Sequence, residues 1–450
     1  MINRCLAVAA VVAVLAGACT SSDDGESGTE QASTSAPSTT IEGSAPESTA
    51  GSTTSAPALT ASFRGVTADS IKVGVHFVDL EVVFDIVALD HGDYQASFQV
   101  VIDRVNEAGG INGRMIEPVF AAIDPIGTDP ATEACIRLTE DEEVFAVIGQ
   151  FLDETPLCYV DSHDTVLVGG SITNELIGRA EAPWFTNNAS ADRLNTDILN
   201  AFVDGGEFEG TTVGVVGNAV DQGLVDEVVI PTLEAGGVET IETAFIEDTG
   251  GNEAESDVQV AVIAERFESS GVDAVVVVDA AAIPLLGGLE DVAYRPKLLA
   301  TALGSVRVFI RDEAGRDLSV LEGAVAGNQA EQLIWWDDPA IQECIELIEA
   351  ATPGLEIFDP ATRPEGEAEN IVSIFTACHT VELFAQIATA AGVDLTNETF
   401  LAAGEALGTV DMPGIGEVRF GPDKYDGAES IYLYQWNDEA QDLISDGVAL

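Results

Sequence analysis

Basic residues are scarce in this sequence. Lysine and arginine together number 17 against 78 aspartates and glutamates, which gives a formal net charge of −61. The lysines are Lys72, Lys297 and Lys424. Because binding phosphates requires charge of the opposite sign, this composition excludes a nucleic-acid partner. Adaptation of the surface to salty surroundings and lysine depletion in a high-GC genome both explain the acidity, and the sequence does not separate these causes.

Motifs of the common α/β enzymes are also missing. The apolar segment 71–77 is followed by Val78-Asp79-Leu80 and not by G-x-G-x-x-G, so no dinucleotide fingerprint is present. There is no P-loop, G-x-S-x-G or H-E-x-x-H. The four histidines show neither ligand nor triad spacing, and the lack of C-x-x-C argues against a metal site or a redox pair. We therefore expect no catalytic residue, no cofactor and no metal, and an enzyme is the least favoured class of function.

The N-terminus has the pattern of a secretory signal. A short cationic start is followed by an apolar run over 6–15, too short for a permanent membrane helix, so residues 1–18 are interpreted as a signal peptide. Ala16-Gly17-Ala18 fits ordinary signal peptidase. The run 15–19 instead resembles a bacterial lipobox, although its leucine lies one residue too far from Cys19. We favour lipid attachment at Cys19, which would anchor the exported chain to a membrane.

A polar tail follows the signal. Residues 19–62 consist mainly of serine, threonine, glycine, alanine and proline with scattered acids, and they contain almost no apolar side chains that could offset the entropy of ordering. We expect this segment to be a disordered tether. No later segment is expected to span a membrane, because the apolar run 274–289 is interrupted by Asp279, Pro284 and two glycines.

Four cysteines remain after the signal and the proposed lipid site, and an even number in an oxidising compartment indicates disulfides. They are Cys135, Cys158, Cys344 and Cys378. Three pairings are available. We favour the two that join neighbours in sequence, Cys135 with Cys158 and Cys344 with Cys378.

The folded part alternates strands and helices, and its buried strands are nearly continuous runs of valine, isoleucine and alanine, as a parallel sheet covered on both faces requires. We therefore expect an α/β fold with two doubly wound parallel sheets. Expected strands cover 71–77, 115–122, 144–149, 165–169, 211–217, 239–246, 272–278, 297–301 and 321–327. At the end of the chain we expect a hairpin that pairs 416–420 with 431–436.

Several segments resemble the leucine/isoleucine/valine-binding proteins, the type I periplasmic receptors of ABC importers. The most specific is the helix end and turn NEAGGINGR at 106–114. The others are GVT at 65–67, IKVG at 71–74, the acids and strand at 140–149, GEVRF at 416–420 and YLYQW at 432–436. The resemblance covers about residues 64–440.

This resemblance implies two lobes joined by three hinge crossings, which we place at 187–192, 316–321 and 423–430. The first lobe would then comprise 63–189 and 320–422, and the second 190–319 and 423–450. The ligand would lie between the lobes at the carboxyl ends of the strands, where open α/β sheets bind ligands.

In relatives, the loops after the third and fourth strands hold the ligand carboxylate through hydroxyls and backbone N–H groups. The first of these loops here includes Phe151, Leu152, Asp153 and Thr155. Asp153 stands where relatives often have serine. It would repel a ligand carboxylate, or it simply caps the helix. The second loop supplies Ser171 and Thr173, of which Thr173 is either a ligand contact or a plain helix cap.

In the far lobe, the usual aromatic residue is missing before Gly223, and the loop 302–305 carries no acid. Asp279, at a strand end, is our candidate partner for a ligand ammonium, with a solvated strand-end residue as the alternative. In the first lobe, His91 is a candidate for a hydrogen bond to a polar ligand. The fold is thus expected to carry over from the family, but its specificity for branched-chain amino acids is not.

The sequence therefore predicts an extracytoplasmic substrate-binding protein of an ABC importer, a lipid-anchored monomer that captures a small polar or amino-acid-like solute by closure of two lobes. Its partners would be the solute and the permease subunits in the membrane. The alternative is a sensor of the same fold that presents its ligand to a membrane signalling partner.

Overall fold

A computed structural model describes most of the chain after the N-terminal segment. The described residues are 59–80, 90–124, 129–151, 155–239, 241–249, 252–312, 315–329, 336–359, 363–364 and 367–450. The expected signal peptide, Cys19, most of the tether, and the site candidates Leu152 and Asp153 lie outside them.

A parallel five-stranded sheet forms the first lobe, in the order β2-β1-β3-β4-β5. Its strands are β1 (Ser70–Val78), β2 (Met115–Ile123), β3 (Ala146–Gly149), β4 (Val166–Gly169) and β5 (Trp184–Phe185). Alternate residues of β1 point to opposite faces, so Val73 and Val75 join one apolar core while Gly74 lies against Leu138 and Val147 of the other. Apolar side chains thus cover this sheet on both faces.

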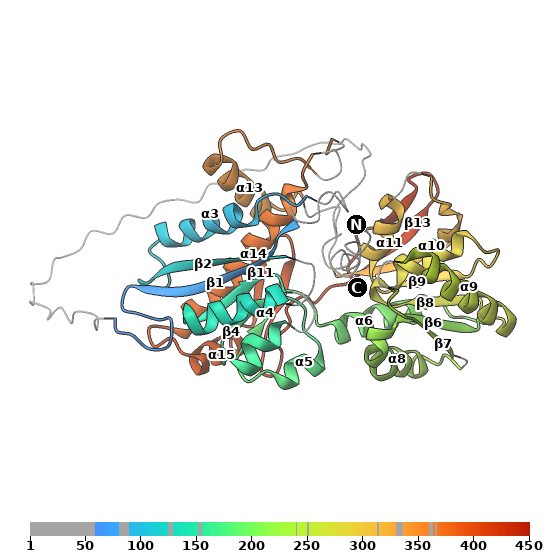
Figure 1. The fold of residues 1–450 in the computed structure, drawn as a ribbon, viewed down its shortest axis with the longest axis horizontal. Coiled ribbons are helices and arrows are strands. Elements are labelled where there is room, and N and C mark those ends of the chain that lie inside the picture. The colour runs from blue at the N-terminus through green and yellow to red at the C-terminus, as the bar shows by residue number, and fades with distance from the viewer. Residues whose placement is uncertain are drawn as a thin grey trace, which may run out of the picture.

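The helices of the first lobe come from both ends of the chain, as the blue and orange ribbons in Figure 1 show. They are α3 (Tyr94–Glu107), α4 (Asp129–Ile136), α5 (Asn174–Arg179), α13 (Pro339–Ala351), α14 (Asn370–Ala391) and α15 (Asn397–Glu405), with π-helical turns at Arg137–Asp141 and Cys158–Ser162. α14 packs against α3, α13, α15 and β3.

α14 is long and apolar enough to cross a membrane, which the sequence analysis did not foresee. However, 72% of its most apolar stretch is buried inside the protein. Its buried side chains include Cys378, Phe384 and Ile387, which belong to the core of the first lobe. A helix surrounded by other elements has to be apolar on all sides, and this explains its composition.

A seven-stranded sheet forms the second lobe, in the order β14-β13-β10-β9-β8-β6-β7. Its strands are β6 (Val213–Asn218), β7 (Ile241–Ile246), β8 (Ala274–Val277), β9 (Lys297–Ala300), β10 (Val325–Asn328), β13 (Tyr432–Asn437) and β14 (Asp442–Ser445). The first five in this list run parallel to one another, and β13 and β14 are antiparallel additions.

Helices and short turns also cover this second sheet, which has an apolar core on each face. The helices are α6 (Ala191–Asp204), α7 (Gln222–Leu224), α8 (Ile230–Ala235), α9 (Glu253–Ser270), α10 (Ala282–Glu290) and α11 (Leu303–Asp312). The turns are Ala219–Asp221, Val225–Val229, Asp279–Ala281 and Leu318–Leu321. Figure 1 shows the two lobes side by side. The expected doubly wound α/β fold is confirmed.

Two expectations about chain pairing were wrong. β12 (Gly416–Arg419) pairs with β11 (Thr409–Met412), while β13 joins the second sheet, so the expected hairpin between 416–420 and 431–436 does not form. β10 also lies in the second sheet, so the return to the first lobe comes after Asn328 and not at 316–321. Residues 320–328 accordingly belong to the second lobe. An alternating apolar pattern identifies a strand but not the strand with which it pairs.

Three segments cross between the lobes. The first joins β5 to α6 and the third joins β12 to β13, both near the expected positions. These two crossings are hydrogen-bonded to each other, with Thr186 N–H donating to the Tyr425 carbonyl (3.0 Å) and Ala428 N–H to the Asn187 carbonyl (2.8 Å). Gln329 lies at the start of the second crossing and connects it to the first, because its side-chain oxygen accepts from Ala189 N–H at 2.7 Å.

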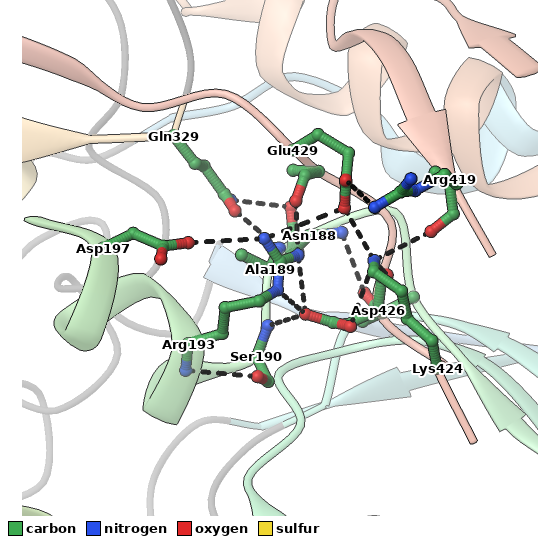
Figure 2. Close-up of polar contacts among 12 residues, drawn as sticks. Asn188, Ala189, Ser190, Arg193, Asp197, Gln329, Arg419, Lys424, Asp426 and Glu429 are labelled. Atoms are coloured by element: carbon green, nitrogen blue, oxygen red, sulfur yellow. Dashed lines mark hydrogen bonds and ion pairs between the residues drawn. The ribbon is translucent and has the colours of Figure 1, made fainter. Parts of the chain in front are cut away.

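Charged side chains reinforce this hinge (Figure 2). Arg193 on α6 lies 2.7 Å from Asp426 and 3.9 Å from Glu429 on the third crossing. Lys424 lies 3.4 Å from Asp426 and 2.9 Å from Glu429. The first helix of the second lobe is therefore held to the third crossing by a partly buried ionic network.

Two disulfides join cysteines in the described part of the chain, and they are the pairs favoured from the sequence. Cys135 is bonded to Cys158, which links α4 to a neighbouring π-helical turn. Cys344 is bonded to Cys378, which links α13 to α14. Both disulfides lie in the first lobe.

Candidate functional site

The loops after β3 and β4 lie together at the carboxyl edge of the first sheet. β3 ends at Gly149 with φ of +126°, and a Cβ at that position would lie 2.1 Å from the His76 carbonyl oxygen. Glycine is therefore required where the strand turns into the first loop. A Cβ at Gly170 would lie 3.0 Å from the Phe151 ring, so the two loops are in contact.

A hydrogen-bonded chain connects α3 to the first of these loops. The Gln150 amide donates to the Tyr94 hydroxyl at 3.1 Å, and that hydroxyl shares a hydrogen bond of 2.9 Å with His91 Nδ1. Burial, followed by the positive charge of Arg363, lowers the pKa of His91 to about 4. His91 is therefore neutral and fully buried, and its place is behind Tyr94 and Gln150. The sequence identified His91 but not Gln150.

Phe151, a predicted ligand contact, is buried in the first lobe. Its ring stacks on His76 with centroids 4.9 Å apart, and both rings pack against Tyr159. Burial lowers the pKa of His76 to about 4, against a smaller opposing effect of its hydrogen bond to the Gln150 carbonyl. These three packed rings thus hold the start of the loop after β3 in place. The sequence gave no reason to single out His76 for this role.

The hydroxyls predicted from the sequence lie in or beside these loops. Ser171 is exposed, and Thr173 is the N-cap of α5, where its hydroxyl oxygen accepts from Leu176 N–H at 3.1 Å. The capping alternative for Thr173 is thus present in the structure, and its hydroxyl still has a proton to donate. The carbonyl of Thr155 accepts from Cys158 N–H at 3.2 Å. Of the seven first-lobe candidates, Leu152 and Asp153 fall outside the described residues.

Asp279 lies at the corresponding edge of the second sheet, two residues after β8. Its backbone has φ of +46°, and its N–H donates to the Thr301 hydroxyl at 3.2 Å, just beyond β9. Burial, followed by the negative charge of Asp221, raises the pKa of Asp279 to about 6, against a smaller opposing effect of a hydrogen bond with Asn195. Asp279 is thus a half-buried carboxyl group at the end of this strand.

Asp221 and Asn195 are neighbours of Asp279 that sequence reasoning missed as site residues. Asp221 closes the turn that follows β6, and its carboxyl group is hydrogen-bonded to Asn218 at the end of that strand. Burial raises the pKa of Asp221, against opposing effects of these hydrogen bonds. The ends of β9, β8 and β6 are adjacent because these strands are neighbours in the sheet. The sequence does not reveal this strand order, so it could not show that these residues lie together.

The N-terminus of α6 adjoins the carboxyl edges of both sheets. In the loop after β4, the Ile172 carbonyl accepts from Ala191 N–H at 2.9 Å, and Asn174 N–H donates to the Asp192 carboxylate at 2.8 Å. One turn further along α6, Asn195 reaches Asp279. Backbone groups of the first lobe and the start of this helix in the second lobe therefore meet next to the hinge.

The described residues offer one grouping of potential metal ligands, Cys135, Cys158 and His163. These two cysteines form a disulfide and have no thiolate to offer, so the grouping does not make a metal centre.

Comparisons with known proteins agree with this geometry. A family model described as periplasmic binding protein matches residues 87–441. No curated protein matches the chain.

Solved structures of ABC-transporter binding proteins share the fold. A fatty acid substrate-binding protein from Thermomonospora curvata is 15% identical with a TM-score of 0.61, over 87% of this chain and 95% of that one. A leucine binding protein from Thermotoga maritima is 12% identical with a TM-score of 0.58, over 84% and 98%. A solute binding protein from Rhodopseudomonas palustris, in complex with 3,4-dihydroxybenzoic acid, is 12% identical with a TM-score of 0.57, over 85% and 96%.

At such low identity these structures establish similarity of fold and not of ligand. The family model covers more than three quarters of the sequence, including all strands of the two sheets except β1 and β14. The chain therefore belongs to the periplasmic binding protein family.

Proposed function

We propose that this chain is the extracytoplasmic substrate-binding protein of an ABC importer and captures a small polar or amino-acid-like solute between its lobes. The observation that carries the proposal is the pair of doubly wound sheets whose carboxyl edges meet at α6 beside a three-segment hinge. Closure about such a hinge replaces the hydration of the solute with fixed hydrogen bonds, and the permease engages the closed form.

On the first lobe we assign solute contact to Ser171, Thr173 and Thr155, together with the loop that contains Leu152 and Asp153. His91 and Phe151 are buried, and their part is to position Tyr94, Gln150 and the loop backbone. On the second lobe the contact is Asp279.

The test is direct binding. Purified full-length protein is titrated by calorimetry with amino acids, amides, amines and aromatic acids, and the recovered solute is identified by mass spectrometry. We expect one solute molecule per chain, recovered unchanged. Steady conversion of a solute into a product would show an enzyme and contradict the proposal.

A matched pair of variants tests the assigned contact. Ser171→Ala removes an exposed hydroxyl from the loop after β4, and we expect affinity to fall about threefold to tenfold through loss of a hydrogen bond to the solute. Ser269→Ala, on α9 in the second lobe, is the control and should leave affinity unchanged. Equal affinities of the two variants would remove Ser171 from the site.

We also propose that Cys19 carries a lipid anchor and that residues 20–62 tether the lobes to the membrane. Cys19→Ala should move the protein from the membrane fraction to the soluble exported fraction. Tight membrane retention of this variant would contradict the anchor while leaving the binding function intact.

A further inference from the structure

Asp221 and Asp279 form a pair of carboxylates at one edge of the second sheet. They follow neighbouring parallel strands, β6 and β8, and the negative charge of Asp221 acts on Asp279. Like charges close together destabilise each other, most of all where burial reduces hydration.

No lysine or arginine forms an ion pair with either carboxylate among the described residues, and none contributes to their pKa shifts. Two buried carboxylates of the second lobe and hinge are, in contrast, each paired with an arginine. Arg307 lies 3.2 Å from Asp442, and Arg193 lies 2.7 Å from Asp426. A cation from outside the protein would therefore offset the charge of this half-buried pair.

Asn195 adds a further acceptor at the same position. Its side chain is 1% exposed, and its amide donates to the Ala191 carbonyl at 2.9 Å, whereas its oxygen is buried without a hydrogen-bond partner. The Asn195 amide N–H also donates to the Asp279 carboxylate, so this side chain lies beside the carboxylate pair. The unsatisfied oxygen costs free energy until a donor reaches it.

In the first lobe, a backbone N–H group at the end of the loop after β4 is not free for an anion. Asn174 N–H, at the start of α5, already donates to the Asp192 carboxylate at 2.8 Å. A solute carboxylate placed here would meet the negative charge of Asp192.

We propose that the captured solute is a small organic cation, a protonated amine or a guanidinium that carries no carboxylate of its own, and that Asp221, Asp279 and Asn195 receive it. Its N–H groups donate to the carboxylates and to the unpartnered Asn195 oxygen, and its charge offsets the pair. This assignment rests on the proposed receptor function and names the chemical class of its solute.

The experiment is calorimetric titration at about pH 8 and about 0.1 M salt with three classes of probe. The probes are amines without a carboxylate (putrescine, agmatine, choline), zwitterions (leucine, glutamine) and carboxylates (benzoate, hexanoate). We expect saturable one-to-one binding within the first class and none in the third. Binding confined to zwitterions or to carboxylates overturns the assignment but leaves the receptor function standing. Failure of every probe overturns the assignment.

The variants separate a local from a general effect of charge. Asp279→Asn and Asp221→Asn should each weaken binding of the amine about tenfold or more, because each removes a charged acceptor in the site. Asp273→Asn removes the same charge at the opposite end of β8, where Asp273 is exposed, and should change affinity by less than about twofold. Equal losses in all three variants would show nonspecific attraction and overturn the assignment.

Stability of the unliganded variants tests the same idea without any ligand. If no cation compensates the Asp221 and Asp279 carboxylates in the unliganded protein, removing one charge relieves their repulsion. The Asp279→Asn variant should then unfold at the same temperature as the wild type, or higher, at about pH 8. A marked fall in that temperature would mean that Asp279 is paired within the folded chain, which contradicts the assignment.

Discussion

His76 lies in the middle of the first lobe, with its ring between Phe151 and Tyr159 and its Nδ1 hydrogen-bonded to the Gln150 carbonyl. Its Nε2 is buried without a partner, so protonation would place a positive charge where no acceptor is available. This neutral, aromatic setting holds the loop after β3 in place.

The burial of His76 predicts a dependence of stability on pH. Its pKa is about 4 in the folded protein and about 6.5 when unfolded, so the unfolded chain binds the proton more readily. Stability is therefore fully present above pH 6.5 and is lost as the pH falls toward 4. The loss from this residue is about 2 kcal/mol at pH 5.

His76→Phe should remove this contribution. Urea denaturation at about pH 7.5 and about pH 5 measures the loss of stability in wild type and variant, and the variant should lose about 2 kcal/mol less than the wild type between the two. His163→Gln, near the surface, is the control and should behave like the wild type. If His76→Phe has the same pH dependence as the wild type, His76 binds its proton over the same pH range in the folded protein as in the unfolded chain.

Only some residues of the candidate site could be identified from the sequence. Thr173 and Asp279 were identifiable because each follows a recognisable strand. Gln150 and Asn195 were not, since a single amide in a loop or helix carries no pattern. Their roles come from neighbours brought close by strand order, such as Tyr94 and Asp279.

At the scale of elements, α13 and α14 depend on a covalent link. Cys344 and Cys378 join them across a separation of 34 residues, close to the long stretch of chain that contains the second crossing. Closing such a loop restricts the unfolded chain and is worth about 3–4 kcal/mol in the chain-entropy model.

Replacing Cys344 and Cys378 together by alanine should therefore lower the free energy of unfolding of the first lobe by about 3 kcal/mol. Calorimetry resolves this if the lobes, which have separate cores, unfold in separate transitions. The transition of the second lobe should not move. A shift of both transitions by the same amount would show that the lobes unfold as one unit.

The hinge crossings also depend on a small set of contacts. Arg193 connects α6 to Asp426, whose side chain is 11% exposed. Removing one partner of a buried ion pair leaves the other uncompensated, and Lys424 offsets only part of that loss. The network is therefore worth more than a surface pair.

Arg193→Gln should lower the free energy of unfolding by about 1–3 kcal/mol in urea denaturation. Arg179→Gln breaks the exposed pair between Arg179 and Glu175 on α5, and it should cost less than about 0.5 kcal/mol. Similar small costs for both variants would mean that the hinge is held by its backbone hydrogen bonds alone.

Most elements were foreseeable from the sequence, whereas their partners were not. Valine- and isoleucine-rich runs predicted the parallel strands, and the repeated α/β pattern predicted two lobes. β10 and β13 were assigned to the wrong neighbours, because an apolar pattern identifies a strand but not its partner in the sheet. Which distant strands pair depends on how the whole core assembles. A local sequence pattern carries no information about that assembly.

For the molecule as a whole, the dominant electrostatic quantity is the net charge of −61. Seventeen basic residues cannot neutralise it, so the folded chain repels itself more strongly than the expanded unfolded chain does. Salt reduces this repulsion, because the screening length falls from about 10 Å at 0.1 M to about 3 Å at 1 M.

We therefore expect the unfolding temperature to rise steeply between about 0.05 and 0.5 M NaCl and to level off once charges a few residues apart are screened. KCl should give the same curve, since screening depends on ionic strength. Equimolar sucrose is the control for exclusion of the solute from the protein surface, and it should not reproduce the early rise. The hinge pairs oppose this trend, because salt also weakens the attraction of Arg193 to Asp426, but they are partly buried and less accessible to screening than the surface acids. A flat or falling unfolding temperature over this range would mean that local ion pairs, and not the overall charge, control the electrostatics of the fold.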